Sequence, residues 1–249
     1  MLLSSIRPRR NLNLGPEFMM YDPAPRRGPA TSEERWIYGI FMVVFFGLLV
    51  GEVFHDFSPV KLSGLLVFLF WMPLVALHEA GHAVVATLVG WNVGRVVIGV
   101  GRTLGSFRLG SAVVEIHTLP VEGFVSCVPR NLHLPRLKSA LIYFAGPGVE
   151  LLLSLVILLI VRPDRLFSRS DDYVIIVCQS LAIAATFQAV VNLIPHAIVR
   201  PEGSIANDGL GIIRSFLRPE SDFANMIGRT YNRREREWQE HDPADWWKR

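Results

Sequence analysis

The chain has 249 residues, of which 51% are hydrophobic and 19% are charged, and its formal net charge is +3. Soluble domains average roughly 45–50% apolar and 25% charged residues, so the composition leans toward a membrane protein and excludes a disordered chain. Its two cysteines spell no CxxC motif and are too few for a disulfide scaffold. The nearly balanced charge gives no argument for nucleic acid as a partner.

The first 35 residues combine five prolines with six arginines and contain no apolar run long enough for the core of a signal peptide. We expect a flexible basic arm that stays in the cytosol. Four apolar runs follow, each long enough to cross a hydrocarbon core of roughly 30 Å at 1.5 Å per residue. They cover residues 36–53, 62–91, 140–161 and 173–195.

Four core helices in a soluble chain of this length would leave too little polar surface to cover them. The sequence therefore predicts an all-α polytopic membrane protein with about four transmembrane helices. Residues 36–209 would form the membrane domain. The amphipathic, charged tail 210–249 would be a surface helix or a membrane-surface anchor.

The basic residues predict the orientation of these spans. Of the 25 Lys and Arg residues, 21 lie in segments on one side of the four spans and four lie in the loops on the other side. Because basic segments stay in the cytosol, both termini and the stretch between spans two and three should be cytosolic. We expect a multi-pass protein of a bacterial cytoplasmic membrane, in contact with membrane lipid.

Residues 95–128, between spans two and three, do not have a helical pattern. Six glycines from Gly94 to Gly123 divide this stretch into short β-rich pieces such as RVVIGV and SAVVEIHT. Hairpins are the natural interpretation, so we predict a small membrane-associated β insertion. Within it, GVGRTLG is more typical of turns than of a nucleotide-binding loop, because its glycine spacing is wrong and no helix follows.

The second span contains the motif HEAGH at residues 78–82. On a helix this HExxH pattern puts His78 and His82 one turn apart on one face, where both can bind the same zinc ion, and puts Glu79 beside them to take a proton from water. Polar side chains inside a span are expensive, so three together need a use.

A tetrahedral catalytic zinc ion needs a third protein ligand and keeps its fourth position open for water. The sequence offers two candidates. Glu150, in AGPGVELLL on the third span, would resemble the glutamate ligand of soluble HExxH zinc proteases. Asp208 lies just past the cytosolic end of the fourth span.

An ordered set of motifs runs from about Leu62 to Gly209. It consists of HEAGH within a span, a Gly-rich β region ending in LPVEGFV, AGP opening the next span, NLIP, and a later Asp-Gly pair. In order and membrane context this set resembles the site-2 protease family of intramembrane zinc metalloproteases. The resemblance covers some 60% of the chain.

The resemblance implies a three-helix catalytic core with one zinc ion held by His78, His82 and Asp208, with Glu79 as the catalytic base. It also implies a membrane-embedded hairpin that helps present an extended substrate strand. The position of Glu150 is often Asn in the family, where it is thought to help hold substrate. We accordingly expect Glu150 and Asn192, the Asn of NLIP, to bind substrate.

The predicted function is that of a zinc endopeptidase that cleaves a transmembrane segment of another membrane protein. Two alternatives remain at this stage. A non-catalytic zinc-binding scaffold or sensor on the same core is favoured if Asp208 cannot reach the metal. A different membrane zinc hydrolase would use Glu150 as its third ligand.

Overall fold

The computed structural model describes residues 32–55, 57–200 and 203–229. Residues 1–31 of the predicted basic arm and residues 230–249 of the predicted tail lie outside the described residues. Two small antiparallel sheets accompany the helices, so the structure is mostly helical with a β insertion, as expected.

The helices follow the apolar runs. They are α1 (Ser32–His55), a short 3-10 turn (Pro59–Lys61), α2 (Leu62–Leu88), α3 (Pro135–Val161), the one-turn α4 (Pro163–Leu166) and α5 (Tyr173–Leu193). Within the described residues, the helices over Pro59–Leu88, Pro135–Val161 and Tyr173–Leu193 are long and apolar enough to cross a membrane. In α1 the apolar part runs from Gly39 to His55, which is shorter, so the first predicted span (residues 36–53), and with it the count of four spans, stays a prediction.

The ends of the helices differ from the predicted ends for local reasons. Helix α2 ends at Leu88 rather than Trp91, because the chain turns at Gly90 with a φ of +82° that favours glycine. Helix α3 begins at Pro135, before the apolar run, because proline suits the first helical turn. Helix α5 begins at Tyr173, as predicted, after Asp172, whose side chain accepts a hydrogen bond from the Val174 N–H, and it ends at Leu193, two residues before the predicted end.

Strands β1 (Trp91–Leu109) and β2 (Ala112–Pro129) form the predicted insertion as one antiparallel sheet. The short pieces expected from the sequence are parts of these two long strands, and Val96 has a partner on each side, Val125 and Val114. Gly99 and Gly101, both with positive φ, lie where the register of β1 shifts. The glycines therefore bend a strand rather than end it.

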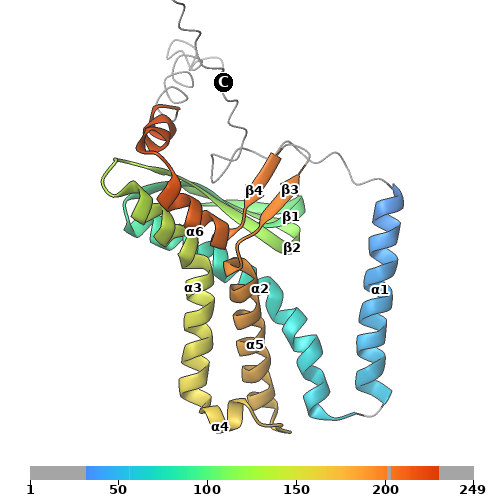
Figure 1. The fold of residues 1–249 in the computed structure, drawn as a ribbon. Helices are drawn as coiled ribbons and strands as arrows, with labels where there is room; N and C mark the ends of the chain where they lie inside the picture. The colour runs from blue at the N-terminus through green and yellow to red at the C-terminus, as the bar shows by residue number, and fades with distance from the viewer. Residues whose placement is uncertain (1–31, 56, 201–202, 230–249) are drawn as a thin grey trace, which may run out of the picture.

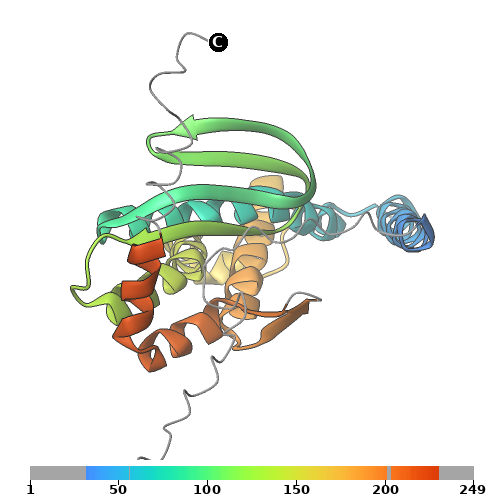
Figure 2. The same ribbon diagram turned by 90° about the horizontal axis from the view of Figure 1, so that it is seen from above.

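Helices α2, α3 and α5 form a bundle below this sheet (Figure 1). Helices α2 and α3 approach closely at Gly81, where a Cβ atom would come within 2.7 Å of the Ala145 carbonyl oxygen. Seen from above, the β1–β2 sheet lies over α2, and the C-terminal elements lie on the other side (Figure 2). These are the hairpin β3 (Ala197–Arg200) and β4 (Gly203–Ala206), followed by α6 (Asp208–Leu217).

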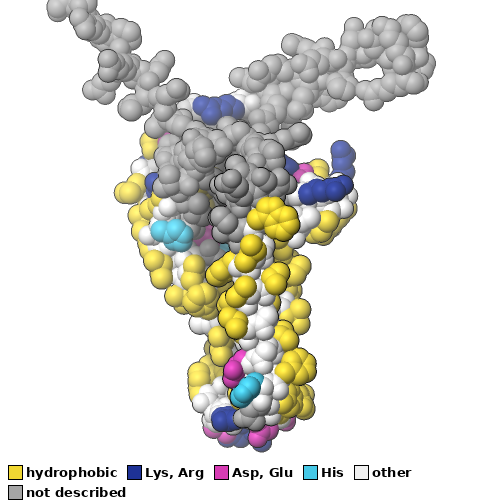
Figure 3. All heavy atoms as spheres, turned by 90° about the vertical axis from the view of Figure 1, so that its right-hand side faces the viewer, with side chains coloured by type: hydrophobic (Ala, Val, Ile, Leu, Met, Phe, Trp, Pro, Cys, Tyr) yellow, Lys and Arg dark blue, Asp and Glu magenta, His cyan; other side chains and the backbone are white. Residues whose placement is uncertain are grey.

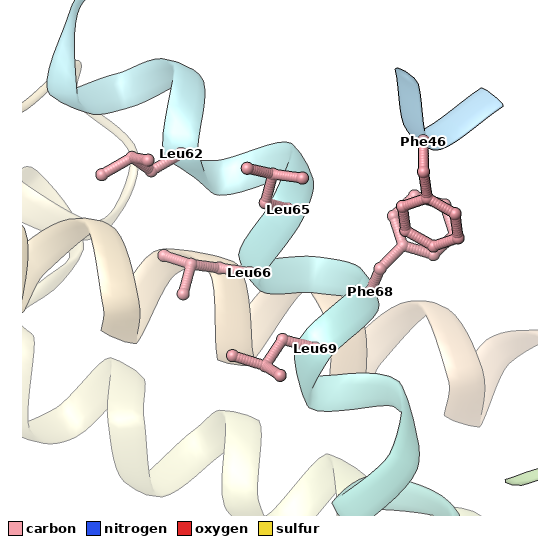
Figure 4. A pocket seen from close by; sticks show the side chains of 6 residues that line it. All are labelled: Phe46, Leu62, Leu65, Leu66, Phe68 and Leu69. Atoms are coloured by element: carbon pink, nitrogen blue, oxygen red, sulfur yellow. The ribbon is translucent and has the colours of Figure 1, made fainter. Parts of the chain in front are cut away.

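Helix α1 stands apart from the bundle (Figures 1 and 2). Hydrophobic side chains dominate the face that it presents, with charged groups gathered at its lower end (Figure 3). An apolar cavity of about 430 Å³ lies between α1 and α2, as Figure 4 shows. Its lining comes from Phe46, Leu62, Leu65, Leu66, Phe68 and Leu69, none of which carries a group for acid–base chemistry or metal binding.

Candidate metal centre

Three polar residues of α2 are buried within the bundle. His78, Glu79 and His82 are 6%, 4% and 4% exposed. Because the histidines are four residues apart on one helix, their rings lie on one face, and their Nε2 atoms are 3.0 Å apart. The HExxH spacing therefore places His78 and His82 side by side, as the sequence predicts.

Asp208 comes to this pair from 130 residues further along the chain. Its Oδ2 atom lies 2.9 Å from His78 Nε2 and its Oδ1 atom lies 3.3 Å from His82 Nε2. One ligand atom from each of the three residues falls within 4.8 Å of the others. A tetrahedral zinc ion with bonds of about 2.0–2.1 Å holds neighbouring ligand atoms about 3.3 Å apart, so the three residues fit the ion.

Asn207 explains how Asp208 reaches the histidines across the β3–β4 hairpin. The Asn207 N–H donates to the His196 carbonyl oxygen at 3.1 Å, and Asn207 Oδ1 accepts from the His196 N–H at 3.0 Å. Asn207 Nδ2 also donates to the carbonyl oxygens of Asn192 and Ile194 at the end of α5. The hairpin is thus closed at its base, and α6 begins directly beside the end of α5.

Gly146 of the AGP motif provides the room for a metal ion. A Cβ atom on this residue would lie 2.5 Å from His82 Nε2 and 2.6 Å from His78 Nε2. Any larger residue would place a carbon atom against both Nε2 atoms. That carbon would occupy the space into which their lone pairs must point to bind one ion. The glycine therefore keeps the backbone of α3 clear of the ligand atoms.

The other ring nitrogen of each histidine meets a protein oxygen. His82 Nδ1 lies 2.6 Å from the Ile142 carbonyl oxygen, which requires the nitrogen to donate. His78 Nδ1 lies 3.2 Å from Glu150 Oε2, within ion-pair distance but at an angle unfavourable for a hydrogen bond. Since both Nδ1 atoms face protein oxygens, both Nε2 atoms are left to bind a metal.

Glu79 lies against the sheet. A Cβ atom on Gly123 would lie 2.6 Å from both Cγ and Oε1 of Glu79, so the backbone of β2 passes directly beside this carboxylate. The Glu79 Oε2 atom is buried and has no hydrogen-bond partner among the described residues. The arrangement brings the Glu79 carboxylate, the predicted ligands and a strand backbone together in one place.

The charges of the site favour an ionised aspartate. Burial by itself would raise the pKa of Asp208, which lies outside the membrane-spanning helices, but the adjacent His82 and His78 lower it below its ordinary value. Metal ligands must be deprotonated, so this carboxylate suits the role.

The remaining predicted residues have different surroundings. Glu150 is fully buried and faces His78. The backbone oxygen of Asn192 accepts from Asn207, and His196 is exposed at the base of the hairpin. The substrate-binding roles of Glu150 and Asn192 stay predictions.

Sequence reasoning missed the positions of Asn207 and Ile142 in the site. An Asn before a helix is a common N-cap, and the Asn207 Oδ1 atom does accept from the Leu210 N–H, so this pattern could have indicated its position. The role of the Ile142 carbonyl oxygen could not be predicted, because every residue has a backbone carbonyl and the residue type does not indicate what it contacts.

Comparisons with known proteins agree with this geometry. The model of peptidase family M50 matches residues 65–211, more than half of the chain. Zinc metalloprotease Rip1 of Mycobacterium tuberculosis and of Mycobacterium bovis is 34% identical over an alignment of 98 residues, and the match covers 34% of this chain and 24% of the relative. Zinc metalloprotease Rip1 of Mycolicibacterium smegmatis is 32% identical over an alignment of 102 residues, and the match covers 34% of this chain and 25% of the relative.

The chain matches only about a quarter of the length of these relatives. The family match, by contrast, covers α2 from Leu65 through the Asp-Gly pair and so includes both histidines, the AGP motif and Asp208. With the three apolar helices, the chain belongs to peptidase family M50, the site-2 protease family of membrane metalloproteases.

Proposed function

We propose that this protein is a zinc endopeptidase that cleaves a transmembrane segment of another membrane protein. The observation that carries the proposal is the convergence of His78 and His82 with Asp208 at distances that suit one zinc ion, beside the carboxylate of Glu79. Asp208 reaches the histidines, which argues against the scaffold alternative. Glu150 faces the opposite nitrogen of His78, which argues against the alternative with Glu150 as third ligand.

The residues have separable tasks in hydrolysis. Zinc in such a site supplies a Lewis acid that activates water and polarises the scissile carbonyl. Glu79 removes a proton from the attacking water as the new C–O bond forms, and then delivers that proton to the leaving amide nitrogen as the C–N bond breaks. The buried setting keeps soluble proteins away from the site.

The sheet supports a way to hold the substrate. A peptide bond in a helix is closed to attack, so the substrate must be extended at the cleavage point. An extended segment can pair with the edge of a sheet through its backbone. The approach of β2 at Gly123 to Glu79 favours the sheet within Arg95–Val125 as the surface where the substrate strand is held.

The experiment that tests this function uses the full chain in detergent or proteoliposomes with a model transmembrane substrate. We expect cleavage within or beside the transmembrane segment of the substrate, loss of cleavage on removal of zinc with a chelator, and recovery on adding zinc back. Cleavage that persists without metal, or a purified protein that binds no zinc, would contradict the proposal.

We also propose that the membrane domain is inserted with the metal centre toward the cytosol. The loops with few basic residues, at Lys61 and around α4, lie at one end of the molecule, and the sheet with α6 lies at the other (Figure 1). His82 is six residues from the end of α2, about 9 Å along the helix, so water has a short path from that side.

Cysteine labelling in intact cells tests the orientation. A reporter cysteine at Ser168, which is exposed near α4, should react with an impermeant reagent, and one at the exposed Ser221 should react only after the cells are opened. The background should lack Cys127 and Cys178. The reverse pattern of labelling would show that the metal centre faces the outside.

A further inference from the structure

His78 contacts acidic side chains on both edges of its ring. Its Nε2 atom faces Asp208 and His82, at 2.9 Å and 3.0 Å. Its Nδ1 atom faces the Glu150 carboxylate at 3.2 Å. A histidine that shares a metal through Nε2 can still use Nδ1–H to hold its ring in one orientation.

Helix α3 places Glu150 for this contact, and the same helix leaves room for a metal ion at Gly146. Glu150 lies four residues after Gly146, so both residues lie on the same face of α3. One turn of that face leaves room at the Nε2 edges of the histidines, and the next turn presents a carboxylate to Nδ1 of His78.

Apart from His78, the Glu150 carboxylate has no partner in the site among the described residues. The residue is 0% exposed, and neither carboxylate oxygen has a hydrogen-bond partner among the described residues. A carboxylate inside an apolar helix bundle is costly unless it is paired, and removing one partner of such a pair is strongly destabilising. The ring of His78 is the partner at ion-pair distance.

We propose that Glu150 is a positioning residue: its carboxylate holds the Nδ1 edge of His78 at the observed ion-pair distance of 3.2 Å, and it accepts from Nδ1–H once the ring turns Nε2 toward a bound metal. The inference rests on the proposed zinc site. It assigns Glu150 a role behind the ligand rather than in contact with substrate, because a fully buried side chain cannot touch a bound peptide without rearrangement. His82 has the equivalent support from the Ile142 carbonyl oxygen.

The test measures zinc affinity of the purified full chain by competition with a chromophoric chelator. Glu150→Leu is expected to weaken zinc binding about 10- to 100-fold, the usual cost of losing an outer partner of a metal-bound histidine. Glu150→Gln should bind zinc within a few-fold of wild type, because its amide oxygen can still accept from Nδ1–H. The visible spectrum of the Co²⁺-loaded leucine variant should also change.

A matched control is Gln179→Leu. The buried Gln179 side chain donates hydrogen bonds to the carbonyl oxygens of Arg165 and Ser168, at the α4 end of the bundle. This substitution should leave zinc affinity unchanged. Should Glu150→Leu fail to fold, Glu150→Asp withdraws the carboxylate by one methylene and is expected to weaken zinc binding in the same direction.

Two outcomes would overturn the inference. Wild-type zinc affinity in Glu150→Leu together with a raised KM would make Glu150 a substrate contact. Complete loss of zinc in Glu150→Gln would make it a direct ligand. A wild-type protein that binds no zinc would instead refute the proposed function itself, so the two failures are distinguishable.

Discussion

Replacing Glu79 by glutamine is expected to lower peptide hydrolysis by about 10²–10⁴-fold while zinc stays bound. Glutamine has nearly the same shape as glutamate, so it fits the tight space beside Gly123, but its amide cannot take a proton from water. The two histidines and Asp208 meet without Glu79, so the metal should not be lost. Initial rates on a model transmembrane substrate and zinc content of the same preparation provide both readouts.

Glu220→Gln is the matched control, because Glu220 is exposed on a helix after α6 and this substitution makes the same chemical change at a residue outside the metal site. It should keep full activity. Full activity in Glu79→Gln would exclude the role of general base. Loss of zinc in Glu79→Gln would show that Glu79 is a ligand. The inactive variant is also suited to capturing an uncleaved natural substrate.

Replacing Asp208 by alanine is expected to remove zinc binding and activity together. The change deletes one of three charged or polar groups that meet at 2.9–3.3 Å, and it leaves two buried histidines facing an open space. The loss of zinc affinity should exceed the roughly 100-fold that loss of an outer partner such as Glu150 costs. Zinc affinity and hydrolysis are measured on the same protein.

Asp164→Ala, at the exposed turn α4, is the control for loss of an aspartate and should change neither quantity. Asp208→Asn preserves the shape of the side chain, so it separates loss of a ligand from loss of folding; it too should bind zinc poorly. If Asp208→Ala retains the metal and Glu150→Gln strips it, the assignment of the third ligand is wrong and Glu150 takes that place.

The sequence by itself determined the parts of the protein that depend on neighbours a few residues apart. Apolar runs of about 20 residues predicted the helices α2, α3 and α5, because a buried or membrane-facing helix needs continuous apolar surface. The spacing of His78 and His82 predicted one helix face, because residues four apart always share it. The glycine-rich stretch predicted strands, but the turn expected at GVGRTLG is a bend within β1.

Tertiary structure decided the contacts between distant parts of the chain. The partner of Glu150 is His78 because Gly81 and Gly146 let α2 and α3 approach closely, and no periodicity within either helix encodes that crossing. Asp208 reaches the histidines because Asn207 closes the β3–β4 hairpin at its base. The number of residues between Asn192 and Asp208 does not predict this closure. Local patterns constrain one helix or strand at a time, whereas a site built from several of them exists only once their side chains have packed.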